Sequence, residues 1–69
     1  MLMVGDSVQI TPRTQDARAF WAFVDGWHGT VRGAGQGGRF VVVCQREDGP
    51  KTFYVEPDSL TKIHTFGRA

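Results

Sequence analysis

The 69-residue sequence predicts a small all-β domain in which five short strands curl into a single antiparallel barrel. Three observations predict this class: apolar residues alternate with polar ones in several runs, Phe40–Cys44 is a strongly β-branched run, and turn-forming glycine or proline separates the runs. A chain of this length hides only about 60% of its unfolded surface, so one core has to use nearly every apolar residue. We therefore expect one domain over residues 1–69, with a folded part over 4–63 and a tail over 64–69.

The strands follow from local patterns, and their expected ranges are 7–11, 27–33, 39–46, 51–56 and 60–63. In the first, Val8 and Ile10 alternate with polar residues, which is the period of a half-buried strand. The β-branched third run suggests the central, most buried strand. In the fourth, Phe53 and Val55 lie on one face and Tyr54 on the other. The predicted core consists of Val8, Ile10, Val31, Val42 or its neighbours, Phe53, Val55, Leu60 and Ile63.

The connections contain the residues that end or bend strands. Pro12 ends the first strand because proline brings no backbone donor to a sheet. Residues 12–25 form the longest connection, in which Asp16 could cap one or two helical turns; the alternative is an irregular loop. Residues 33–38 include four glycines, and we expect a flexible hairpin loop without regular structure there. Residues 57–60 are typical of a single 3₁₀ turn.

Charge, cysteine usage and hydropathy restrict the class of protein. Eight Lys and Arg against seven Asp and Glu leave a formal charge of +1, which disfavours strong non-specific nucleic-acid binding. The single cysteine, Cys44, excludes an internal disulfide framework and suits a reducing compartment. The start of the chain has no basic segment followed by an apolar run, and no stretch approaches the ~18 apolar residues of a membrane span. We expect a cytoplasmic protein with no membrane contact.

Motifs that resemble catalytic or cofactor sites have simpler interpretations. Three glycines of 33–38 satisfy G-x-G-x-x-G, but residues 39–43 have a strand pattern where a dinucleotide site needs a helix. Cys44 ends a valine run and is expected in the core rather than as a nucleophile. His28 and His64 with Cys44 lack the close paired spacing of a zinc site. We predict no catalytic residue, no metal and no cofactor.

Four large aromatic residues in the first long connection exceed what so small a barrel easily buries; they are Phe20, Trp21, Phe23 and Trp27. Those that stay exposed would form a recognition surface, and the alternative is that they plug the ends of the barrel. Gly26 and Gly29 let the chain turn sharply into the second strand, which holds Trp27 near the barrel wall. Phe20 and Trp21 then lie on a looser tether, so we expect Trp21 to be the more exposed indole.

Arginines lie in or beside this connection and the glycine hairpin: Arg13, Arg18, Arg32 and Arg39. The connection and the hairpin can share one edge of a barrel, which would mix guanidinium groups with aromatic faces. Such a surface stacks single-stranded bases or binds an acidic protein partner. The alternative is that the arginines are scattered and solvated. The predicted binding residues are Phe20, Trp21, Trp27, Arg13, Arg18, Arg32 and Tyr54.

Several short motifs together resemble the SH3-like barrel superfamily over residues 4–63: Val4-Gly5-Asp6-Ser7-Val8-Gln9-Ile10, Gly29-Thr30-Val31, Phe40-Val41-Val42-Val43, Phe53-Tyr54-Val55 and Leu60-Thr61-Lys62-Ile63. Ferredoxin-interacting electron-transport accessory proteins have a similar opening, aromatic first loop, G-T-V strand and L-x-x-I ending. KOW domains have a similar strand-glycine-strand arrangement. Plasmid-type dihydrofolate reductase has a similar opening and ending, but its essential Val-Gln-Ile-Tyr strand falls where this chain has Phe53-Tyr54-Val55-Glu56.

The resemblance implies a small non-enzymatic SH3-like barrel that acts as a binding module or accessory subunit. We expect a protein partner, recognised through the aromatic and arginine-containing first loop. One alternative is a KOW-like domain that binds RNA or associates with the ribosome or transcription machinery. A second alternative is a pore-type reductase. Such an enzyme would have to be an oligomer, because a lone barrel has no cavity of ligand size. Either a monomer or a homo-oligomer is compatible with the sequence.

Overall fold

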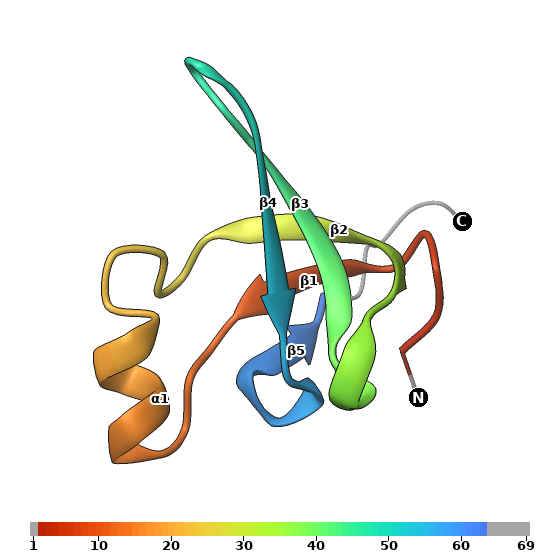
Figure 1. Cartoon of the computed structure of the whole chain (residues 1–69). Helices are drawn as coiled ribbons and strands as arrows, with labels where there is room; N and C mark the ends of the chain where they lie inside the picture. Colours follow the sequence, from red (N-terminus) through yellow and green to blue (C-terminus); the bar gives the residue numbers. More distant parts are fainter. Residues whose placement is uncertain (1, 64–69) are drawn as a thin grey trace.

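The computed structural model describes residues 2–63, and its five antiparallel strands in one sheet confirm the all-β class. The strands are β1 (Ser7–Ile10), β2 (His28–Ala34), β3 (Phe40–Arg46), β4 (Gly49–Val55) and β5 (Leu60–Lys62). They pair in the order β4-β3-β2-β1-β5 (Figure 1). The connections contain one helix, α1 (Gln15–Phe20), and two 3₁₀ turns, η1 (Gln36–Gly38) and η2 (Pro57–Ser59). The predicted tail, residues 64–69, lies outside the described residues.

Each strand lies within two residues of its predicted bounds. The largest shift is in β4, which begins at Gly49 because Gly49 and Pro50 pair with Arg46 and Gln45 of β3. Only two residues remain in the turn, so β3 and β4 form a long hairpin that projects beyond the rest of the sheet (Figure 1). Proline is tolerated in β4 because this strand lies at the edge of the sheet.

The glycine-rich segment 33–38 is ordered, so the expectation of a loop without regular structure is wrong. Its first two residues continue β2 after a register shift, and the last three form η1. The backbone N–H of Gly35 donates to the carbonyl of Arg39 at 2.7 Å and closes the hairpin. Gly37 and Gly38 have φ values of 68° and 77°, a left-handed conformation that glycine adopts without steric cost. The glycines therefore allow a compact turn rather than a flexible one.

The long first connection contains a short helix, which is one of the two alternatives expected there. Its N-cap is Thr14 rather than Asp16. The extended backbone of Thr14 places its hydroxyl to accept the backbone N–H of Ala17 at 3.1 Å. Asp16 lies inside the first turn, where a carboxylate favours the positive end of the helix. Within residues 2–63, no helix is long and apolar enough to cross a membrane.

The core contains most of the predicted residues and two that were not predicted. Its buried apolar members are Val8, Ile10, Trp21, Val24, Val31, Val42, Cys44, Val55 and Leu60. Phe53 packs against them while half-buried, and Ile63 is also half-buried. Trp21 and Val24 come from the first connection, which therefore covers one side of the sheet. Burial raises the pKa of the Cys44 thiol despite the nearby charge of Arg46, so Cys44 packs as an apolar side chain, as predicted.

Gly29 of β2 gives a test of this packing. A Cβ atom at this position would lie 2.7 Å from Val42 Cγ1 and 2.8 Å from both Cys44 Sγ and the Val43 carbonyl oxygen. We expect Gly29→Ala to lower the free energy of unfolding by about 1–3 kcal/mol, measured by urea denaturation. Gly33→Ala is the matched control, because nothing lies within 4 Å of the added methyl group. Equal stability of the two variants would contradict the close approach of β2 to β3.

Candidate binding site: the aromatic face

One side of the molecule has a continuous series of aromatic contacts that begins on α1 and ends on the β3–β4 hairpin. Phe20 meets Trp21 edge-on at 4.7 Å between ring centroids, and Trp21 meets Phe53 of β4 at 6.0 Å. Phe53 in turn meets Trp27 at 6.0 Å, and the guanidinium carbon of Arg46 lies 3.7 Å from the Trp27 ring centroid. Edge-on contacts at these distances are the favourable geometry for aromatic pairs. We call these five residues together with Phe23 the aromatic face.

Trp21 is the buried anchor of the aromatic face. Its side chain is only 6% exposed, so the expectation that Trp21 is the more exposed indole is wrong. The connection is not a loose tether, because successive backbone hydrogen bonds join Trp21 to Ala17, Val24 to Trp21 and Trp27 to Val24. These bonds wind residues 21–27 into a compact series of turns that directs the Trp21 ring inward.

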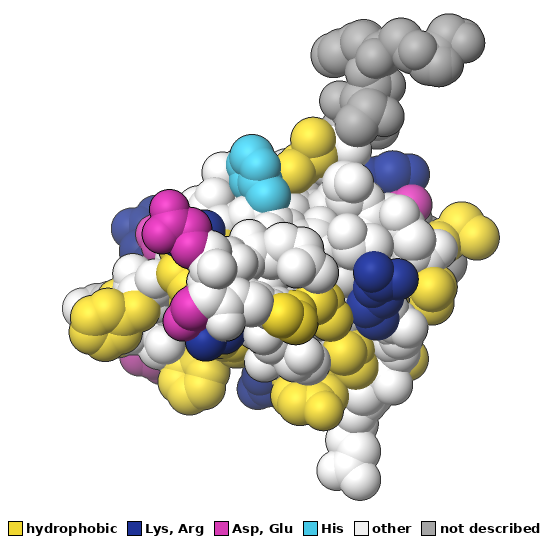
Figure 2. Space-filling model, turned by 90° about the horizontal axis from the view of Figure 1, so that it is seen from above, with side chains coloured by type: hydrophobic (Ala, Val, Ile, Leu, Met, Phe, Trp, Pro, Cys, Tyr) yellow, Lys and Arg dark blue, Asp and Glu magenta, His cyan; other side chains and the backbone are white. Residues whose placement is uncertain are grey.

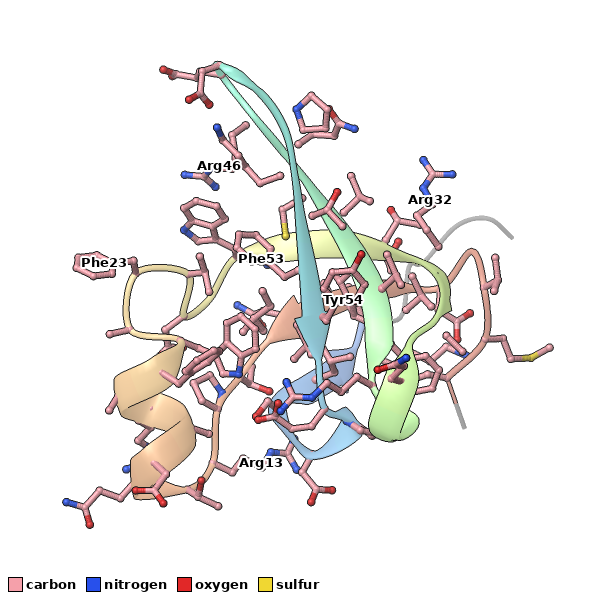
Figure 3. All side chains as sticks on the ribbon, in the orientation of Figure 1. Arg13, Phe23, Arg32, Arg46, Phe53 and Tyr54 are labelled. Atoms are coloured by element: carbon pink, nitrogen blue, oxygen red, sulfur yellow. The ribbon has the colours of Figure 1, made fainter. Side chains whose placement is uncertain are left out.

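Phe20 and Phe23 are the exposed members of the aromatic face. Phe20 is 72% exposed and Phe23 is 94% exposed, so neither plugs an end of the barrel. Trp27 is half-buried against Phe53, as expected for a residue held near the sheet. The labelled side chains of Phe23, Arg46 and Phe53 all lie on the side of the molecule that the α1–β2 connection covers (Figure 3). The aromatic face thus contains two exposed phenylalanines and one half-buried indole, Trp27.

Of the four arginines expected there, Arg13 and Arg32 lie away from this face, whereas Arg39 lines a hollow with Phe20. Arg13 donates to Thr61 Oγ1 at 2.9 Å, near β5, and Arg32 lies on the opposite side of the molecule from Phe23 (Figure 3). Arg18 lies in the last turn of α1. The arginine that contacts the aromatic residues is Arg46, which the sequence analysis missed. Strand alternation could have found it, because Arg46 has the same parity as the buried residues of β3.

Tyr54 belongs to a different surface. It alternates with Phe53 along β4, as predicted, and is 56% exposed. It lines a hollow of about 530 Å³ with Gly35, Gln36 and Arg39. The predicted binding residues are therefore divided among the aromatic face, the Tyr54 surface and separate arginines.

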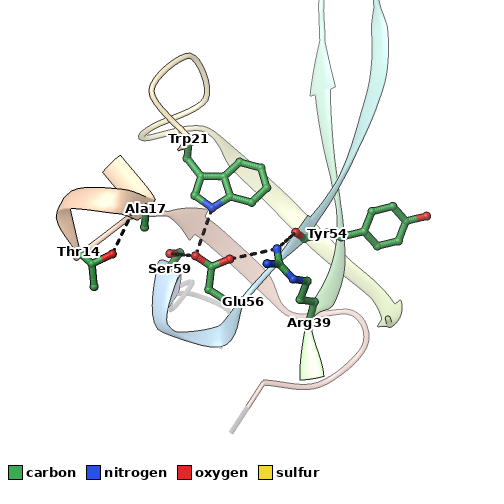
Figure 4. A network of polar contacts seen from close by, with 7 residues as sticks. All are labelled: Thr14, Ala17, Trp21, Arg39, Tyr54, Glu56 and Ser59. Carbon is green, nitrogen blue, oxygen red and sulfur yellow. Dashed lines mark hydrogen bonds and ion pairs between the residues drawn. The ribbon is translucent and has the colours of Figure 1, made fainter. Parts of the chain in front are cut away.

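Glu56 connects the aromatic face to the end of β4. Its carboxylate accepts hydrogen bonds from Ser59 Oγ at 2.7 Å and Trp21 Nε1 at 3.4 Å, and lies 3.4 Å from Arg39 Nη1 (Figure 4). Arg39 Nη1 also donates to the Tyr54 carbonyl at 3.0 Å. Burial alone would raise the pKa of Glu56, but the hydrogen bonds from Ser59, the backbone and Trp21 and the charge of Arg39 outweigh it. The pKa is held below its ordinary value of 4.5.

Ionisable groups near the aromatic face are of both signs. A hollow of about 310 Å³ beside α1 is lined by Thr14, Asp16, Ala17, Phe20, Arg39 and Glu56. Figure 2 shows acidic and basic side chains interspersed with hydrophobic ones on the surface of the molecule. In residues 2–63, no group of three or more His, Cys, Asp or Glu is placed to hold a metal ion; His64 lies outside that range. The arrangement is suited to contact with a mixed apolar and polar surface.

No protein-family model matches the sequence, and no curated protein matches it either. Function is therefore inferred from the geometry of the described residues.

Replacing Trp21 and Phe23 in turn distinguishes a buried aromatic residue, which stabilises the fold, from an exposed one, which does not. We expect Trp21→Ala to lower the free energy of unfolding by about 3–5 kcal/mol, the usual cost of removing a buried aromatic ring. Trp21→Phe keeps most of the packing but loses the bond to Glu56, so its effect should be smaller. Phe23→Ala should stay within about 0.5 kcal/mol of the wild type, because its ring contacts little. Chemical denaturation measures all three, and a large loss for Phe23→Ala would contradict its exposure.

The lowered pKa of Glu56 predicts a dependence of stability on pH. A group whose pKa falls on folding stabilises the fold when it is ionised, and that stability is lost as pH falls through the folded-state pKa. The contribution of Glu56 should thus be complete at neutral pH and disappear well below 4.5. Glu56→Gln should be less stable than the wild type at neutral pH and lose less stability on acidification. Urea denaturation at neutral and acidic pH tests this, and equal acid losses would contradict it.

Proposed function

We propose that this protein is a small non-enzymatic binding module that recognises a protein partner through the aromatic face. The observation that supports this most directly is the exposure of Phe20 and Phe23 in the connection that the buried, hydrogen-bonded Trp21 anchors. Exposed aromatic rings on a rigid base provide contact area at little entropic cost, and aromatic residues with arginine dominate the binding energy of protein interfaces. The anchored Trp21 supplies the rigid base, and Arg46 on Trp27 supplies a polar edge.

The distribution of positive charge favours protein over nucleic acid as the partner. Among the described basic residues, Arg39, Lys51 and Lys62 form ion pairs with Glu56, Asp48 and Asp6. Arg46 lies on an indole, and Arg13 and Arg32 are far from each other on the surface (Figure 3). A backbone of phosphates requires several cations along one track. Basic residues that are already paired with acidic ones, around exposed aromatic rings, better suit a protein partner whose surface has both apolar and polar groups.

The proposal includes an SH3-like barrel fold and a cytoplasmic location. The strand order and the long first connection are compatible with the SH3-like barrel that the sequence motifs resemble. The single buried cysteine remains suited to the reducing cytoplasm. A binding role needs neither cofactor nor metal.

Selection from a peptide library displayed on phage tests the aromatic face, and it requires no identified partner. We expect selected peptides to lose at least about tenfold in affinity for the double variant Phe20→Ser, Phe23→Ser, since hot-spot residues at an interface cost this much. Met3→Ser, Val4→Ser is the matched control, because both side chains are exposed hydrophobics near the N-terminus. A selection without any peptide sensitive to the phenylalanine variant would contradict the proposal.

Fluorescence anisotropy with labelled single-stranded RNA tests the competing class of partner. We expect no saturable binding, because the cations are dispersed or paired. Binding that falls steeply as salt rises and disappears when Arg13, Arg18 and Arg32 are replaced together would favour the KOW-like alternative over a protein partner.

A further inference from the structure

The outer edge of β4 has no partner strand in residues 2–63. The strand is seven residues long and lies at one end of the sheet order. Figure 1 shows it continuing into the projecting hairpin. An exposed edge of this length offers unpaired backbone groups to another strand.

The backbone direction of β4 follows from two hydrogen bonds. The Arg39 carbonyl accepts from Gly35 on the β2 side, so the next residue, Phe40, directs its backbone groups toward β4. Phe40 is paired with Val55, which therefore faces β3, and the adjacent Tyr54 faces outward. The bond from the Arg39 side chain to the Tyr54 carbonyl agrees with this direction. By alternation, the outward-facing residues are Pro50, Thr52 and Tyr54.

Two features limit what this edge can bind. Pro50 has no backbone N–H to donate, and the Tyr54 carbonyl already accepts from Arg39. The groups that remain available are the Thr52 N–H and carbonyl, the Tyr54 N–H and the Pro50 carbonyl. A strand with all its backbone groups free would direct an N–H donor at the Tyr54 carbonyl, which is already bonded, and a carbonyl at Pro50, which has no N–H.

We propose that the β4 edge pairs with β4 of a second copy of this chain, antiparallel about a two-fold axis at Thr52. In this register Thr52 faces Thr52 of the other copy, and Pro50 faces Tyr54. Each missing proline donor then faces a carbonyl that Arg39 already satisfies. The other groups form four hydrogen bonds: two between the threonines, and one from each Tyr54 N–H to the opposite Pro50 carbonyl. The edge is thus complementary to itself, as an isologous two-fold interface requires.

The side chains agree with the same register. Residues directly opposite in an antiparallel pair share a face, so each exposed Tyr54 lies beside the Pro50 ring of the other copy. On the other face each Lys51 lies beside the opposite Phe53, where its methylene stem covers part of a half-buried ring. Phe20 and Phe23 are not on β4, so pairing leaves these two residues available to a partner. The dimer would present two pairs of exposed phenylalanines, while each Phe53 lies beside Lys51 of the other copy.

Hydrogen exchange and molecular mass together test the interface on the unmodified chain. We expect light scattering to show a concentration-dependent dimer between micromolar and millimolar protein. The Thr52 and Tyr54 amides should be protected in the dimer and exchange freely in dilute protein, whereas the Lys51, Phe53 and Val55 amides should be protected in both. A monomer at every concentration, open-ended growth, or a dimer with freely exchanging Thr52 would each overturn the proposal.

A cysteine pair gives a second test that depends on the register. Opposite residues of a hydrogen-bonded antiparallel pair have Cα atoms about 5.5 Å apart, which a disulfide can span. Thr52→Cys should therefore form a covalent dimer under mild oxidation. Lys51→Cys is the matched control, because its opposite residue is Phe53 rather than itself. Equal cross-linking of both variants would overturn the two-fold axis at Thr52.

Thr52→Pro removes the central donor and should weaken the dimer at least about tenfold, because two of the four hydrogen bonds are lost. Thr52→Val keeps the backbone donor and should leave the dissociation constant within about threefold. Circular dichroism of both variants in dilute solution reports whether the monomer stays folded. A folded Thr52→Pro variant that dimerises like the wild type would overturn the proposal.

Discussion

The contact between the Trp21 indole and Glu56 is the interaction on which the candidate site depends. Trp21 lies at the end of α1 and Glu56 at the end of β4, so their hydrogen bond and the packing of the ring close the first connection onto the sheet. The same carboxylate accepts from the buried Ser59 and pairs with Arg39. One acidic group therefore joins the helical connection, the 3₁₀ turn before β5 and the β2–β3 hairpin.

The anchored indole explains why neighbouring aromatic residues have different environments. In a domain of 69 residues the interior volume is limited, and the ring of Trp21 is one of the large side chains that the core accommodates. Phe20 and Phe23 then remain exposed. Exposed rings lower solubility unless a partner covers them. Phe53 belongs both to the aromatic face and to β4, whereas the exposed Phe20 and Phe23 lie outside that strand. A dimer that pairs through β4 therefore leaves the two exposed phenylalanines for a partner.

Arg39 contacts residues of both the aromatic face's surroundings and the open edge of β4. Its guanidinium group lies beside Glu56 and also satisfies the Tyr54 carbonyl at the open edge of β4. Together with Pro50 it removes one acceptor and one donor from the edge, a common protection against unspecific strand pairing. The same two changes make the edge match a second copy of itself, because the missing donor and the occupied acceptor come to face each other.

The sequence by itself determined the strands, the turn before β5 and most of the core, because period-two alternation and proline and glycine positions are local properties. It predicted Val8, Val42 and Cys44 inside correctly. Only the tertiary structure decided which aromatic residues are buried, since Trp21 and Phe23 have equivalent local patterns and differ by the compact turns that follow α1. It also decided that Arg46 rather than Arg13 or Arg32 meets the aromatic rings. Those contacts join β3 to the first connection, and distances between residues far apart in sequence depend on how the sheet curls.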